Sequence, residues 1–165
     1  MKIYTTAVTS FCGILALSQC ESNKKDKLES KIFGAWHSDA EATNADLAKF
    51  AQLNDFQKKA LPALFGRATI TFNRDGSGSI EMQAAKFPKM DGGEIDVPAS
   101  KTSFRFEILG EAESQIVIKS TSEEVIFRDH PFAILKLHDE DTYSVSLSDG
   151  IAMIYGREFF KRIDN

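Results

Sequence analysis

The stretches TSFRFEILGEAESQIVIKS (residues 102–120) and PFAILKLHDEDTYSVSLSDG (residues 131–150) place apolar residues at alternate positions over most of their length. A period of two is that of a β-strand with one buried face. Clusters that contain Gly, Asp or Ser separate the apolar runs, as at residues 110–114 and 139–141, and favour tight chain reversals. Residues 102–163 therefore predict an antiparallel meander, against which the rest of the chain packs.

Three more strands are predicted before the meander, at residues 31–39, at 68–73 and around 80–82. The pair Asp75-Gly76 lies between two alternating runs, which is a strong hairpin signal. The predicted strands are close in number to those that close an up-and-down barrel. The sequence thus predicts a mainly β fold, an antiparallel up-and-down meander that closes into a small barrel of about 8 to 10 strands. An open sheet or a sandwich is the alternative.

A helical segment is predicted between the first two strands. Thr43 and Asp46 stand in the order of a capping box, so a helix should begin at Thr43. Pro62 should break or kink the segment and Gly66 should end it. We expect this segment to form a short helical lid after the first strand. Residues 87–100 are rich in Pro and Gly and predict a long loop.

Composition limits the domain number and the class of partner. The chain has 165 residues and a formal net charge of -4, enough for one domain. A weakly acidic chain without a basic stripe is a poor candidate for binding nucleic acid. Thirteen phenylalanines against one tryptophan predict an interior lined by rings without polar groups. Both cysteines, Cys12 and Cys20, lie near the N-terminus, so the folded body has no disulfide and no cysteine-ligated metal.

The N-terminal residues are typical of a secretory signal. Lys2 supplies a positive charge ahead of an apolar run at residues 7–17, which is too short to span a bilayer as a helix. Leu17-Ser18-Gln19-Cys20 resembles a bacterial lipobox, and this resemblance implies that Cys20 carries the lipid. The alternative is an ordinary apolar N-terminus with an incidental cysteine.

The predicted organisation follows from this N-terminus. Residues 1–20 are the expected lipoprotein signal peptide, the polar residues 21–30 a flexible tether, and residues 31–163 the folded domain. We therefore expect a cell-envelope protein, anchored to a bacterial membrane at its periplasmic or outer-surface face.

Two short features carry a resemblance to a known family. One is Gly34-x-Trp36 on the first predicted strand, and the other is the C-terminal strand with Arg157 and Arg162. In order of elements the domain resembles the calycins, that is, lipocalins and fatty-acid-binding proteins. The resemblance implies that the indole packs beneath a basic side chain, Arg157 or Arg162, from the end of the barrel. Alternatively, Trp36 is a plain core residue and both arginines are exposed strand-end charges.

The resemblance implies binding of a small apolar or amphipathic molecule in the barrel interior, without catalysis. The candidate ligand-binding residues are Trp36, Phe72, Phe104, Phe106, Phe127, Leu135, Tyr143 and Arg157. The apolar residues of this set would equally serve a fully packed core.

Nothing in the sequence predicts catalysis, a cofactor or a metal. His37, His130 and His138 share no metal-ligand spacing. Residues 73–84 copy the spacing of a calcium loop, but Ala84 stands where a bidentate Glu is required. The alternative function is a protein-interaction or inhibitor module of the envelope, acting through the loop at residues 87–100.

Overall fold

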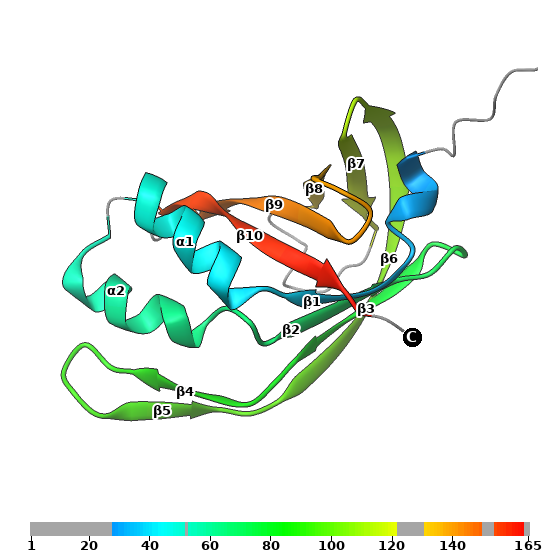
Figure 1. Ribbon diagram of the computed structural model, residues 1–165. Helices are drawn as coiled ribbons and strands as arrows, with labels where there is room; N and C mark the ends of the chain where they lie inside the picture. Colours follow the sequence, from blue (N-terminus) through cyan, green and yellow to red (C-terminus); the bar gives the residue numbers. More distant parts are fainter. Residues whose placement is uncertain (1–27, 52, 122–130, 150–153, 164–165) are drawn as a thin grey trace, which may run out of the picture.

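The computed structural model describes residues 28–51, 53–121, 131–149 and 154–163 (Figure 1). The predicted signal peptide, the predicted lipidation site Cys20 and the candidate ligand-binding residue Phe127 lie outside the described residues.

Eight strands form a closed antiparallel barrel in the order β1-β10-β9-β8-β7-β6-β3-β2. The strands are β1 (Gly34–Ser38), β2 (Ala68–Phe72), β3 (Ser77–Met82), β6 (Ser100–Ala112), β7 (Gln115–Ser120), β8 (Phe132–Leu137), β9 (Thr142–Asp149) and β10 (Ile154–Arg162). The first strand pairs with β2 on one side and with β10 on the other, which closes the sheet and removes its edges. The predicted fold class is confirmed, including the helical segment after the first strand.

The helices are η1 (Leu28–Lys31), α1 (Ala40–Phe50), α2 (Asp55–Ala60) and the 3₁₀ turn η2 (Leu61–Ala63). The predicted start at Thr43 is wrong, because α1 begins three residues earlier. Its N-cap is Asp39, whose side chain accepts a hydrogen bond from the Ala42 amide at 3.1 Å. Thr43 and Asp46 lie within the helix and face β10 instead of capping it. The chain leaves this helical segment through Gly66, at a φ of +79°.

Residues 85–97 form a hairpin, where the sequence predicted a loop. The strands β4 (Ala85–Pro88) and β5 (Glu94–Val97) make a separate two-stranded sheet. The turn between them uses Gly92 and Gly93 at positive φ, and the Lys89 amide donates to the Gly93 carbonyl at 3.1 Å. Figure 1 shows that β4 and β5 continue the direction of β3 and β6 beyond the barrel, below α2.

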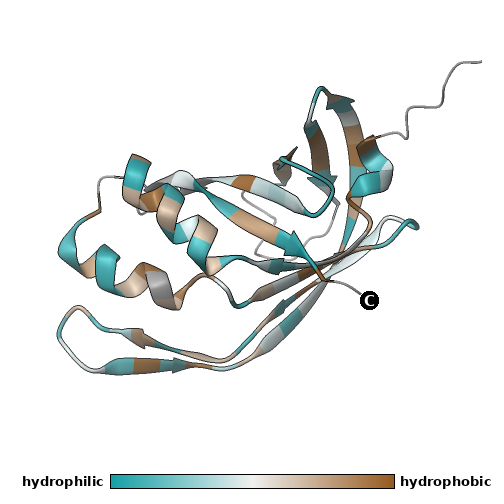
Figure 2. Cartoon of the chain, in the orientation of Figure 1, coloured by the Kyte–Doolittle hydropathy of each residue, from teal (hydrophilic) through white to brown (hydrophobic). Residues whose placement is uncertain are grey.

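The barrel core is aromatic. Tyr143 stacks on Phe160 at 5.0 Å between ring centres and meets the edge of Trp36 at 4.8 Å, while Phe72 packs edge to face against Phe106. Figure 2 shows hydrophobic and hydrophilic residues alternating along the strands, as one buried face requires. Leu28 also packs against this core, so the fold includes residues 28–30, which the sequence assigned to the tether.

Candidate functional site

Three polar side chains face the barrel interior from neighbouring strands. Ser38 of β1 follows Trp36 by two residues, and Glu158 of β10 precedes Phe160 by two, so each shares the inward face of its aromatic neighbour. In the β9–β10 register Tyr143 lies opposite Phe160. Tyr143 and Glu158 are therefore diagonal neighbours, a spacing that long side chains can bridge.

Ser38 holds one oxygen of the Glu158 carboxyl. Its hydroxyl donates to Glu158 Oε1 at 2.6 Å and accepts from the Gly66 amide at 2.9 Å. Burial raises the pKa of Glu158, and the hydrogen bond from Ser38 acts more weakly in the opposite direction. Among the described residues, Ser38 is the one hydrogen-bond partner of this carboxyl.

The Tyr143 hydroxyl has no hydrogen-bond partner among the described residues, although the side chain is 0 % exposed. An unpartnered buried hydroxyl costs about 1–3 kcal/mol, so such groups are uncommon. Burial, and in second place the negative charge of Glu158, raise the pKa of Tyr143 well above its ordinary value. The phenol therefore keeps its proton at neutral pH and can both donate and accept.

The structure brings six of the predicted ligand-binding residues together in one buried cluster. They are Trp36, Phe72, Phe104, Phe106, Leu135 and Tyr143. Arg157 is not among them, because it lies on the opposite face of β10 and pairs with Asp46 of α1 at 2.5 Å. Ser38 and Glu158 were missed by the sequence analysis. The signal for Glu158 was its spacing of two from Phe160, which places a carboxylate on an apolar face.

Arg162 closes one end of the barrel over Trp36. Its guanidinium carbon lies 4.2 Å from the centre of the indole, so Arg162, and not Arg157, makes the predicted contact. The Trp36 ring nitrogen donates to the Ile32 carbonyl at 2.7 Å, which fixes the indole in place.

Helix α1 packs against β10 near Gly156. This position lies six residues before Arg162, roughly 20 Å away along the strand. Beyond Ser38, side chains of α1 replace β1 as hydrogen-bond partners of β10. Thr43 Oγ1 accepts from the Phe159 amide at 2.9 Å, and Asp46 Oδ2 accepts from the Arg157 amide at 3.0 Å. The buried Leu47 packs against Gly156, where an added Cβ would lie 2.5 Å from the leucine. Helix α1 therefore lies along this part of β10, where β1 has ended (Figure 1).

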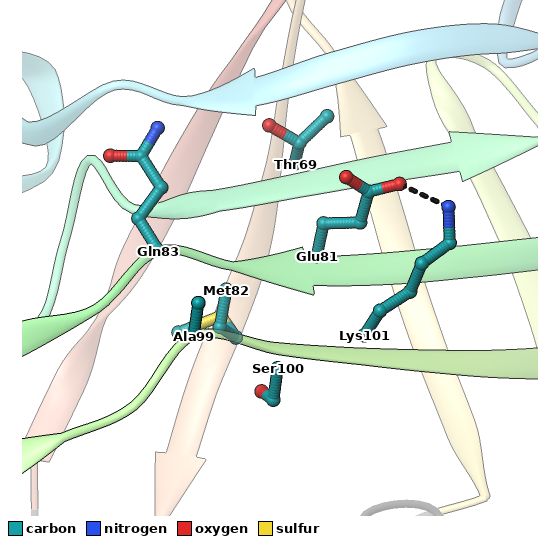
Figure 3. A pocket seen from close by; sticks show the side chains of 7 residues that line it. All are labelled: Thr69, Glu81, Met82, Gln83, Ala99, Ser100 and Lys101. Carbon is teal, nitrogen blue, oxygen red and sulfur yellow. Dashed lines mark hydrogen bonds and ion pairs between the residues drawn. The ribbon is translucent and has the colours of Figure 1, made fainter.

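A hollow lies where β3 and β6 leave the barrel, with a volume of about 450 Å³ (Figure 3). Glu81 and Lys101 project from these strands on the same side as Thr69, and they form an ion pair with each other at 2.5 Å. Because this pair satisfies both charges, the hollow offers weaker recognition than the interior cluster.

The described residues contain no group of three or more His, Cys, Asp or Glu side chains placed to hold a metal ion. No helix in this part of the chain is long and apolar enough to span a bilayer. The chain matches no protein-family model, no curated protein and no solved structure.

Proposed function

We propose that this protein is a lipocalin-like, non-catalytic carrier that holds a small amphipathic molecule inside its barrel. The proposal depends on one observation: a carboxyl group and a phenol hydroxyl without a partner among the described residues lie within an otherwise apolar interior. Polar groups of this kind weaken a core that serves folding alone. A ligand with an apolar body and a polar end would contact both the rings and the two polar groups.

Two further features support a lipocalin-like carrier. Eight strands are enough to enclose side chains and one small ligand. The Gly34-x-Trp36 sequence with Arg162 over the indole corresponds to the contact that the calycin resemblance implied. The barrel interior is the site, and Glu158, Ser38 and Tyr143 are its polar end.

Native mass spectrometry after mild purification tests the carrier. We expect an added mass of a few hundred daltons, comparable to a small amphiphile. Organic extraction should remove it and lower the melting temperature, and returning the extract should restore both the mass and the melting temperature. A barrel that is empty as isolated and that gains no thermal stability from lipid extracts would contradict the proposal.

We further propose that Cys20 anchors the carrier to a bacterial envelope membrane. Acyl chains contribute about 0.8 kcal/mol for each buried methylene, so more than one chain is needed for stable attachment. Mass spectrometry of the native protein should show a chain that begins at an acylated Cys20. The variant Cys20→Ser should leave the membrane fraction. An unmodified Cys20, or residues 1–19 still attached, would refute the anchor.

A protein-interaction module is the second candidate, and the projecting β4–β5 hairpin favours it. Met90 at the hairpin tip is 87 % exposed and Ile95 on β5 is 49 % exposed. Replacing residues 86–96 with a two-glycine turn separates the candidates. If the hairpin is the functional element, this variant loses cross-linking to envelope proteins and keeps its small-molecule mass. If the barrel is the functional element, the shortened variant keeps its small-molecule mass, and neither it nor the wild-type protein cross-links to an envelope protein.

A further inference from the structure

We infer that the polar end of the ligand is a cation, an amine or ammonium group that binds the Glu158 carboxylate beside the Tyr143 hydroxyl. This inference depends on the proposed carrier function and names its ligand class. It follows from the charges that face the interior, from the hydrogen bonds that these groups leave unmade, and from their exposure.

The charge of the interior cluster is negative. Among the described residues Glu158 is its only acidic member, and neither arginine of β10 neutralises it. Arg162 donates to the carbonyls of Lys31 and Phe33 at the far end, and Arg157 pairs with Asp46 on the opposite face. A carboxylate ligand would therefore meet a like charge near the aromatic core, and a cation would meet its counter-charge. The cluster thus selects against fatty acids, although the calycin group includes fatty-acid binders.

The hydrogen bonds of the cluster leave two acceptors for a ligand. Ser38 occupies Glu158 Oε1 and is itself held by the Gly66 amide, so the carboxyl is fixed in orientation. The other carboxyl oxygen accepts no hydrogen bond from the described residues, and the Tyr143 oxygen has none either. An ammonium group carries three donors and no acceptor, which matches a set of acceptors.

Exposure determines which of the two groups the ligand meets first. Glu158 is partly exposed, whereas Tyr143 is fully buried behind it between Trp36 and Phe160. The cation therefore contacts the carboxylate, and the phenol oxygen provides a second acceptor at the inner side. A paired cation would also offset the cost of burying the Glu158 charge. This burial is what raises the pKa of the carboxyl.

Decylamine, decanol and decanoic acid test this assignment, because they share one chain and differ in the head group. Each is titrated into the delipidated protein at pH 7, below its micelle concentration, by isothermal calorimetry. We expect decylamine to bind the wild-type protein at least about tenfold more tightly than decanol, and decanoic acid most weakly.

Three variants test which side chains bind the amine. Glu158→Gln should weaken decylamine binding at least about tenfold more than it weakens decanol binding, because it removes the charge and keeps the shape. Tyr143→Phe should weaken decylamine binding by a smaller factor, about three- to tenfold, through loss of one neutral acceptor. Glu107→Gln removes the same charge from an exposed position on β6 and should change none of the affinities. Circular dichroism and the melting temperature establish that each variant is folded.

The outcomes separate the two proposals. If none of the three probes binds the folded wild-type protein, the carrier function itself is wrong. If the chains bind but decanoic acid or decanol equals decylamine, or if Glu158→Gln keeps the preference for the amine, the carrier stands and the cation site is refuted. Loss of amine preference in Glu107→Gln as well would show a general charge effect and would also refute the site.

Discussion

Arg162 lies over Trp36, with the guanidinium carbon 4.2 Å from the centre of the indole ring. The same guanidinium donates to the carbonyls of Phe33 at 3.0 Å, Lys31 at 2.5 Å and Glu140 at 3.2 Å. One planar side chain thus joins η1, β1 and the β8–β9 turn to the end of β10. A planar fork with five donors is needed for this, and a lysine ammonium does not reproduce it.

Replacing Arg162 by lysine should therefore destabilise the barrel although the charge is kept. We expect Arg162→Lys to lower the free energy of unfolding by about 2 kcal/mol, through the lost carbonyl bonds and the weaker contact with the indole. Urea unfolding followed by Trp36 fluorescence measures this. The matched control is Arg74→Lys, because the exposed Arg74 lies 5.4 Å from the Phe33 ring centre. The control should cost less than about 0.5 kcal/mol. Equal effects at both positions would contradict the bridging role of Arg162.

The lack of a side chain at Gly78 leaves room for the Phe104 ring to pack against the backbone of β3. A Cβ at Gly78 would lie 2.5 Å from the end of that ring and 2.7 Å from the Thr71 carbonyl oxygen. Because the carbonyl belongs to a paired strand and cannot move alone, Gly78→Ala should cost about 2–3 kcal/mol. Gly110→Ala on β6 is the control, since nothing lies within 4 Å of its Cβ. It should be neutral or slightly stabilising in thermal unfolding. A neutral Gly78→Ala would show that the core is looser than these distances imply.

Thr43 provides the hydrogen-bond acceptor that β1 no longer offers to β10. Thr43→Val keeps the shape and leaves the partly buried Phe159 amide without its acceptor at 2.9 Å. We expect a loss of about 1–3 kcal/mol in the free energy of unfolding and faster hydrogen exchange at Phe159. Thr43→Ser retains the hydroxyl and should keep the exchange rate closer to the wild-type value. If the valine and serine variants exchange alike, the hydroxyl is not the partner of this amide.

The repeating pattern of the strands predicted the meander, because each inward face is recorded in the sequence, and the number of strands favoured a closed barrel over an open sheet or a sandwich. The period of two in residues 102–120 and 131–150 identified the meander, and Asp75-Gly76 identified the β2–β3 hairpin. The β4–β5 hairpin was mistaken for a loop, because its glycines and prolines are also typical of irregular chain and its strands have no buried face to produce alternation.

The start of α1 and the interior site depend on contacts that sequence spacing does not contain. Thr43 and Asp46 have the spacing of a cap, yet their side chains serve β10, which is more than 110 residues away along the chain. The aromatic members of the site were predicted from the alternation of the strands and from the Gly34-x-Trp36 motif. The grouping of Ser38, Tyr143 and Glu158 needs the β1–β10–β9 pairing, which exists once the barrel closes.

The free energy of unfolding should depend on pH in a way that reflects the ionisation of Glu158. Burial raises the pKa of this carboxyl above its ordinary value of 4.5, so the folded protein binds the proton more tightly than the unfolded chain. Between pH 4.5 and the folded pKa, the unfolded chain holds fewer protons at this site. The contribution of Glu158 to the free energy of unfolding therefore falls as the pH rises through that window.

Glu158→Gln removes this titration and keeps an acceptor for the Ser38 hydroxyl. We expect the variant to be more stable than the wild-type protein at pH 7, and this advantage should shrink on acidification and level off below about pH 4.5. Urea unfolding of both proteins from pH 4 to pH 8 measures the difference, in which groups common to both, such as Asp39 and His138, cancel. A difference that does not vary with pH would mean that the carboxyl ionises as it does in water. Where the predicted slope appears, the wild-type carboxylate is retained although it weakens the fold, as expected of a binding group and not of a structural one.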